Sequence, residues 1–143
     1  MKIENMVTKS PVSVRIVLSA LWAARMLSGL QGDSTRFHDP VALNELLAGS
    51  SDVPVTDGLL LVMSIVFAFP ILMSVLSLTL PEKANRWANR CIGIFFAVFD
   101  LIFLGLALFV WPFSSYEVLW SVMYLVFTFL VVLYAWKWPK LEN

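Results

Sequence analysis

The chain has 143 residues, of which 59% are apolar and only 14% are charged, and its mean hydropathy is +0.82. Because a soluble domain is about 45–50% apolar and about 25% charged, this composition excludes a soluble globular enzyme and a disordered segment. Ten basic residues against ten acidic ones leave no basic excess for nucleic acid. The sequence therefore predicts a small membrane protein.

Four apolar stretches are long enough to form transmembrane helices, since about 20 helical residues cross a hydrocarbon layer of about 30 Å. They comprise residues 12–31, 58–80, 91–112 and 116–136. The predicted fold is all-α, with residues 1–143 forming one polytopic four-helix transmembrane bundle. The first stretch is the least apolar, because it contains Arg15 and Arg25. A signal peptide is the alternative interpretation, but a retained span is favoured because Arg25 stands where a cleavage region needs small neutral residues.

The longest connection, residues 32–57, contains the pattern of a short helix. Asp39 followed by Pro40 is typical of a helix N-terminus, and a glycine such as Gly49 is typical of a helix end. Leucines at positions 43, 46 and 47 would share one face of this helix. We predict a short amphipathic helix over residues 39–49 in the first outer loop, which either lies in the membrane interface or covers the mouth of the bundle.

The connection between the second and third stretches contains a tandem repeat, in which Ala-Asn-Arg at 84–86 recurs at 88–90 with Trp87 between the copies. Thr79 and Glu82 have the spacing of a capping box, which predicts that the third helix begins before the membrane and continues through the repeat. Arg86 and Arg90 would then lie one turn apart beside Trp87, which suits binding of anionic lipid headgroups. Alternatively, the same residues are ordinary determinants of topology.

The basic residues also predict the orientation of the chain. Eight of the ten flank the same side of the membrane, whereas Arg36 alone flanks the opposite side. By the positive-inside rule, both termini are cytoplasmic. The predicted location is the inner (plasma) membrane, crossed several times by the chain.

Two ionisable residues fall inside the predicted spans, where each is energetically costly. At 1.5 Å per residue, Asp100 lies about 13 Å and Arg25 about 20 Å above the inner ends of their spans. An arginine side chain can bridge that difference in height. Asp100 shares a helix face with the small residues Gly93, Ala97 and Ala107, which are typical of helix–helix contacts. We therefore predict an Arg25–Asp100 ion pair between the first and third spans.

The same matching of heights predicts a polar layer around this pair. Ser64 and Tyr124 fall near the level of Arg25, and Thr128 falls near the level of Asp100. One interpretation is a structural ion pair with hydroxyl partners that determines which helices lie together. The alternative is a cavity in which Arg25 binds an anion and Asp100 exchanges protons, as intramembrane charges do in transporters.

Catalytic and metal-binding patterns are absent from the sequence. One cysteine, Cys91, and one histidine, His38, do not form a metal cluster or a redox pair. We expect no metal, no cofactor and no enzymatic activity. Acylation of Cys91 at the membrane edge is one interpretation, and a small apolar residue in a helix is the favoured one.

In this layout the chain resembles the DoxX-like group of small bacterial four-helix membrane proteins, in which an Arg-bearing first span leads to an outer segment of the kind seen here as DPVALNELLAG. The string Arg-Trp-Ala-Asn at 86–89, with FPILMSVLSLTLP before it, is also similar to uncharacterised bacterial proteins of about this length. The resemblance implies a four-span bundle. The second span has FAFP at 67–70 where that group has an acidic residue, and no catalytic residue is carried over.

From these patterns we expect a structural or accessory membrane protein that packs with itself or with a larger membrane complex. The alternative is a small transporter, or a membrane protein that binds a ligand or quinone through the Arg25–Asp100 layer. The expected partners are membrane lipids, a second copy of the chain or a larger complex, and not nucleic acid.

Overall fold

The computed structural model describes residues 13–49, 56–110 and 114–138. These residues form five α-helices and no strand: α1 Val14–Arg36, α2 Pro40–Ala48, α3 Asp57–Thr79, α4 Glu82–Phe109 and α5 Ser115–Lys137. The all-α prediction is therefore confirmed for the described part of the chain. Residues 1–12 and 139–143, on which the predicted position of both termini depends, lie outside it.

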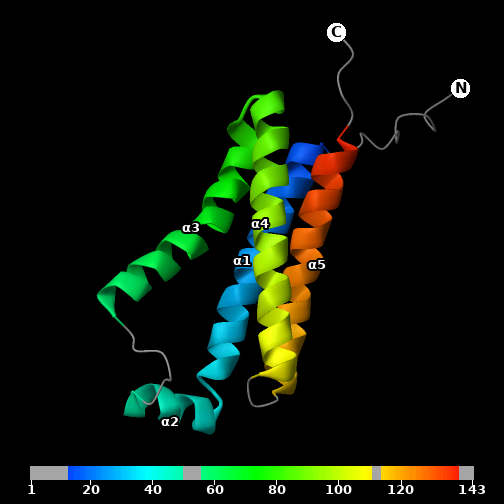
Figure 1. The fold of residues 1–143 in the computed structure, drawn as a ribbon. Coiled ribbons are helices and arrows are strands. Elements are labelled where there is room, and N and C mark those ends of the chain that lie inside the picture. The colour runs from blue at the N-terminus through cyan, green and yellow to red at the C-terminus, as the bar shows by residue number, and fades with distance from the viewer. Residues whose placement is uncertain (1–12, 50–55, 111–113, 139–143) are drawn as a thin grey trace, which may run out of the picture.

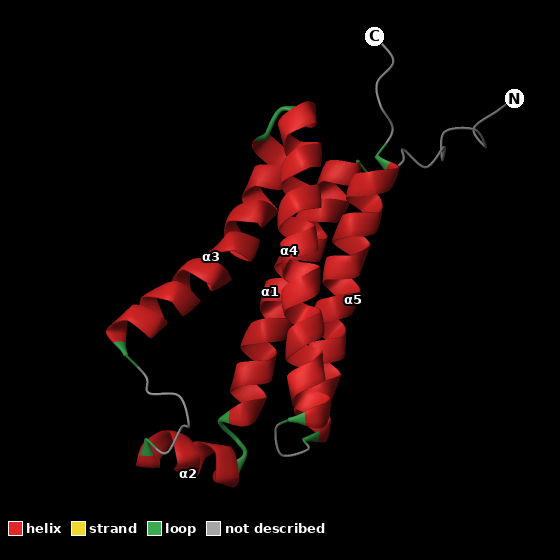
Figure 2. Ribbon diagram, in the orientation of Figure 1, coloured by secondary structure: helices red, strands yellow, loops and turns green. Residues whose placement is uncertain are grey.

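The four long helices run beside one another, and the short helix α2 lies across one end (Figure 1). Helix α5 packs against α4 and α1, and α1 also packs against α3, whereas α3 and α4 touch little. The tight connection between α3 and α4 lies at the end opposite α2 (Figure 2). Helix α1 is thus the element that joins α3 to the α4–α5 pair.

Three of the helices, α3, α4 and α5, are long and apolar enough to cross a membrane. Helix α1 is not among them, because its 23 residues include the charged side chains of Arg15, Arg25, Asp33 and Arg36. Three of the four predicted spans are therefore supported by length and composition. The first span stays a prediction.

A small core holds α1, α3, α4 and α5 together. Its buried apolar side chains are Leu18, Trp22, Met73, Phe96, Val131 and Ala135. The Trp22 ring packs edge-on against Phe96, with the ring centres 5.8 Å apart. Most other large apolar side chains face outward, as expected for a protein whose surroundings are lipid rather than water.

The first half of α3 leans away from the other helices, and Figure 1 shows a bend near the middle of this helix. The helix contains Pro70, which has no amide hydrogen for the carbonyl of Val66 and therefore favours a bend. All of its buried residues lie at or after this proline, namely Pro70, Met73 and Ser77. Most side chains of the first half are therefore exposed, whereas Val66, near the middle of the helix, packs against the core.

Helix α2 begins and ends at the predicted residues. The Asp39 carboxylate accepts a hydrogen bond of 2.9 Å from the Val41 amide, and Gly49 ends the helix in the left-handed conformation, with φ 60°. Its buried residue is Ala42, whereas the predicted apolar face is open, since Leu46 and Leu47 are exposed. Contact of this face with lipid therefore stays a prediction.

Helix α4 begins at Glu82 and runs through the tandem repeat, well before the predicted span at residue 91. The predicted capping box is wrong. The Thr79 hydroxyl donates instead to the carbonyl of Val75, within α3, at 3.3 Å, and no side chain caps the start of α4. A threonine hydroxyl in a helix can share the carbonyl four residues back as an acceptor, and this local bond competes with a capping role.

Candidate functional site

Arg25 of α1 and Asp100 of α4 form an ion pair in the middle of the helix assembly. Arg25 Nη2 donates to Asp100 Oδ1, and Arg25 Nε donates to Asp100 Oδ2 at 3.2 Å. The two residues are 7% and 1% exposed. A guanidinium that binds both oxygens of one carboxylate is the strongest form of such a pair, and it defines the relative rotation of the two helices.

Thr128 of α5 joins the pair and connects it to a third helix. Its hydroxyl lies 2.6 Å from Asp100 Oδ2 and 2.9 Å from Arg25 Nε, which donates to it. The guanidinium also lies over the Phe96 ring, 4.3 Å from its centre. Arg25 therefore has a carboxylate, a hydroxyl and an aromatic face as partners, which is the set that offsets the cost of burying a charge.

The local sequence explains why both charges point inward. In α1 the buried residues Leu18, Trp22, Arg25 and Ser28 recur every three or four positions, which is one helix face. In α4 the corresponding face contains Gly93, Phe96, Asp100 and Ala107. At Gly93 an added Cβ would lie 3.0 Å from a Val132 methyl group, so the absence of a side chain lets α5 come close.

Of the predicted polar layer, the structure places Tyr124 beside Arg25 and Ser64 at an exposed position of α3. The Tyr124 ring centre lies 5.9 Å from the Arg25 guanidinium carbon. Ser64 is exposed on the first half of α3, and its hydroxyl donates to the Leu60 carbonyl at 2.8 Å. Ser64 is thus exposed and bonded within its own helix, which residue counting does not predict, because it gives the height along a helix but not the direction in which a bent helix leans.

A second buried polar cluster connects α1, α3 and α4 nearer to the α3–α4 connection. The Trp22 indole donates to the Asn89 side-chain oxygen at 2.7 Å, and the Ser77 hydroxyl donates to the same atom at 3.2 Å. The Asn89 amide donates to Asn85, whose own amide donates to the Ser77 carbonyl at 2.6 Å. Sequence reasoning missed this cluster, although its signal was present: the repeat places two asparagines four residues apart on one helix face.

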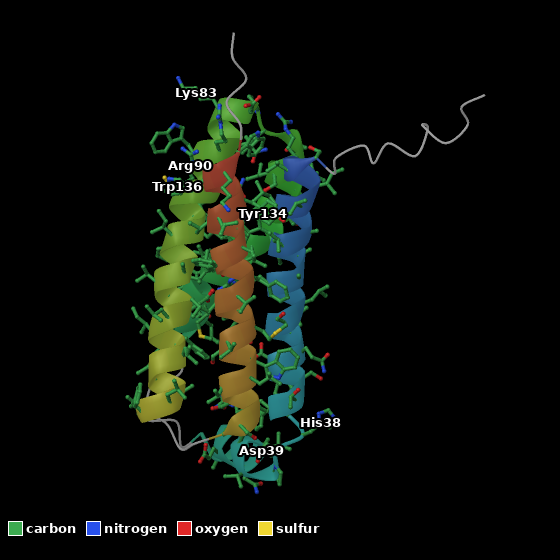
Figure 3. The ribbon with its side chains drawn as sticks, turned by 90° about the vertical axis from the view of Figure 1, so that its right-hand side faces the viewer. His38, Asp39, Lys83, Arg90, Tyr134 and Trp136 are labelled. Carbon is green, nitrogen blue, oxygen red and sulfur yellow. The ribbon has the colours of Figure 1, made fainter. Side chains whose placement is uncertain are left out.

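The two arginines predicted to bind lipid headgroups have protein partners as well. Arg86 pairs with Glu82 at 3.3 Å, and Arg90 Nε donates to the carbonyl of Ala135 in the last turn of α5 at 3.0 Å. Figure 3 shows Arg90 beside Trp136, and the guanidinium lies 5.0 Å from the centre of that ring. Trp87 is 60% exposed. Arg90 thus stabilises the carbonyl end of α5, where a cation is favourable.

A small cavity opens at the α2 end of the molecule, between α1, α4 and α5. It has a volume of about 50 Å³. Its walls are four aromatic rings, two carboxylates, one guanidinium and one glycine, contributed by Phe103, Tyr116, Trp120, Tyr124, Asp33, Glu117, Arg36 and Gly32. Tyr124 belongs both to this cavity and to the surroundings of Arg25.

The described residues contain no group of three or more histidine, cysteine or acidic side chains that could hold a metal ion. Cys91 is a free, exposed cysteine. The arrangement around Arg25 and Asp100 holds α1, α4 and α5 together by charge and hydrogen bonding.

Comparisons with known proteins give one match. No curated protein and no solved structure is similar enough to match the chain. Residues 7–141 match the model of one protein family, which covers nearly the whole length. The chain therefore belongs to DUF6326, a family of unknown function.

Proposed function

We propose that this protein is a small, multi-pass structural or accessory subunit of the inner membrane, which associates with a second copy or with a larger membrane complex. The observation that carries the proposal is the contrast between its interior and its surface. The buried charges Arg25 and Asp100 have partners within the chain, while the first half of α3 has no buried residue. A helix segment whose side chains are mostly exposed is available to a neighbour.

In this proposal α1 crosses the membrane together with α3, α4 and α5, although it is the most polar of the long helices. Its buried Arg25 has a carboxylate partner, which reduces the cost of placing a charge in lipid. Arg15 lies near its start, Asp33 and Arg36 near its end, where charged side chains reach the interface. Both termini would be cytoplasmic, and α2 would lie on the outer side.

Labelling of single cysteines tests this topology, in a Cys91→Ser background. Three exposed positions suit this test. Ser13 directly precedes α1, Asn44 lies in α2, and Lys83 lies in the first turn of α4. We expect Ser13→Cys and Lys83→Cys to react with an impermeant thiol reagent from the cytoplasmic side only, and Asn44→Cys from the opposite side only. Labelling of Ser13→Cys and Asn44→Cys from the same side would show that α1 does not cross the membrane.

Crosslinking tests association through α3. Leu61 in the first half of α3 and Ile102 in α4 are matched positions, with 61% and 59% of their surfaces exposed. In the Cys91→Ser background, Leu61→Cys should give crosslinked dimers or a crosslinked partner in native membranes, whereas Ile102→Cys should not. A strictly monomeric protein in native mass spectrometry, with no crosslink from Leu61→Cys, would contradict the proposal.

The second candidate is a transporter or a ligand- or quinone-binding protein that uses the Arg25 layer. The observation in its favour is that Tyr124 lies both beside Arg25 and in the wall of the cavity at the α2 end. A ligand carboxylate that captured Arg25 would leave Asp100 without its cation, and Asp100 would then take up a proton. This gives a means of coupling a ligand to a proton. The resemblance to DoxX-like proteins adds no residue to either candidate.

A further inference from the structure

We propose that the cavity at the α2 end is a binding site for a small organic cation, of the alkylammonium class. This proposal does not depend on the role of the Arg25–Asp100 pair, and it holds equally if that pair is purely structural. The site consists of Asp33, Glu117, Trp120, Tyr116 and Tyr124, which all line the cavity.

The walls of the cavity provide the chemistry that recognises a cation. The faces of tryptophan and tyrosine rings attract ammonium groups, most strongly where water is partly excluded, and alkylated ammonium ions are the usual ligands of such aromatic cages. Trp120, Tyr116 and Tyr124 come from one helix, α5, and the Phe103 ring of α4 packs edge-on against Tyr124 with the ring centres 6.5 Å apart. The rings are therefore held by helices rather than by loops.

The charges around the cavity have a net negative sum. Two carboxylates, Asp33 and Glu117, face one guanidinium, Arg36. Arg36 Nε lies 3.9 Å from Glu117 Oε1, and half of the Arg36 side chain is exposed, whereas the Glu117 side chain is 22% exposed. A long, water-exposed ion pair of this kind is weak, so an incoming cation competes with it easily.

A glycine lets two rings of the proposed site lie close against α1. A Cβ atom added at Gly32 would lie 2.7 Å from the Tyr124 hydroxyl and 3.3 Å from the Trp120 ring. Both rings would have to move to accept it. At Gly29, one turn earlier in α1, an added Cβ would meet nothing within 4 Å. Gly32 thus has no side chain at the position where a Cβ atom would displace the Tyr124 and Trp120 rings.

The probe for this site is tetramethylammonium, with tert-butanol as an uncharged compound of similar size. Binding is measured on the purified full-length protein in detergent, by the chemical shift of the ¹⁵N-labelled Trp120 indole, assigned with Trp120→Phe. We expect saturable shifts with tetramethylammonium and none with tert-butanol. No saturable shift with tetramethylammonium, or an equal response to both compounds, would overturn the proposal.

Variants separate the cage from general attraction of cations. Asp33→Asn and Glu117→Gln should each weaken binding about fivefold or more, and Arg36→Gln should strengthen it, because it removes the competing cation. Asp57→Asn makes the same change of charge in the first turn of α3, outside the cavity, and should leave binding unchanged. Equal weakening by Asp57→Asn would mean that the probe responds to net charge only, which would refute a built site.

The glycine pair tests the space without a change of charge. Gly32→Ala should abolish the shift, and Gly29→Ala should retain it. Thermal melting without the probe shows whether each variant is folded. If Gly32→Ala fails to fold, Trp120→Leu replaces it, and binding is measured by saturation-transfer signals of the probe itself. Trp120→Leu should weaken binding about fivefold, and Trp120→Phe, which keeps an aromatic ring, should restore it. Retained binding in Trp120→Leu would overturn the proposal.

Discussion

Trp22 and Asn89 are joined by a buried hydrogen bond of 2.7 Å, in which the indole nitrogen donates to the side-chain oxygen, although 67 residues separate them in the chain. The same oxygen accepts from Ser77 of α3. One asparagine side chain therefore connects three helices. It is the acceptor for both the Trp22 indole and the Ser77 hydroxyl.

Replacement of this asparagine should destabilise the protein. Asn89→Leu keeps a similar volume but leaves the Trp22 indole and the Ser77 hydroxyl without their acceptor, so we expect a loss of about 1–3 kcal/mol in the free energy of unfolding. Asn44→Leu, at an exposed position of α2, is the control and should change little. Unfolding by titration with a denaturing detergent measures both. Equal stability of the two variants would contradict the structural importance of the cluster.

The Arg25–Asp100 pair predicts a non-additive mutant cycle. Arg25→Leu or Asp100→Leu alone strands a buried charge and should cost about 3–5 kcal/mol, whereas the double variant should recover most of that stability. Thr128→Val tests the third partner and should cost less than either single change. The unfolding titration again gives the free energies.

The same cycle separates the two candidate functions. A double variant that is as stable as the original and unchanged in every binding and transport assay would exclude a ligand role for the pair. A stable double variant that has lost a ligand-induced shift in melting temperature would identify the pair as a site. Additive losses in stability would contradict the pairing itself.

Close packing of α4 on α5 depends on Gly93. Gly93→Ala would place a methyl group 3.0 Å from Val132 Cγ2 and 3.4 Å from Val131 Cγ1, and branched valines have little freedom to move. Gly105→Ala in the same helix meets nothing within 4 Å and should stabilise by up to about 1 kcal/mol, because alanine favours the helix over glycine. We expect Gly93→Ala to be clearly less stable than Gly105→Ala in thermal melting. The opposite order would mean that α5 shifts freely.

Docking of α2 should depend on pH through Asp39, which lies between α1 and α2. Its carboxylate accepts from the Val41 amide and, at 3.0 Å, from the Tyr116 hydroxyl, and these bonds lower its pKa from the ordinary value of 3.8. A lowered pKa means that the stabilisation is present above pH 3.8 and is lost as the pH falls through the lower value in the folded protein. The amide chemical shift of Val41 follows this titration.

Two variants provide the controls for this titration. Tyr116→Phe removes one donor and should move the midpoint upward, toward 3.8. Asp39→Asn keeps an oxygen acceptor without an ionisable group and should abolish the transition. A midpoint at or above 3.8 in the unmodified protein would contradict the assignment.

Some features of this protein follow from the sequence by itself. The excess of apolar residues predicts a membrane protein made of helices. In lipid, where water cannot serve as a partner, an α-helix satisfies its backbone polar groups within its own segment. Asp39 and Gly49 define the ends of α2 through local hydrogen bonding and a backbone conformation that glycine adopts readily. Arg25 and Asp100 are expected to pair because unpaired charges at similar heights in a membrane are costly.

Other features were decided only by the tertiary structure. Heights along helices follow from the rise per residue, but the rotation and lean of each helix depend on packing. The bend in α3 therefore takes Ser64 out of the polar layer, while the rotation of α4 turns Asn85 and Asn89 inward. The cavity at Gly32 also requires three helices to meet at one height. Residue spacing describes one helix at a time, and each of these features is a relation between helices.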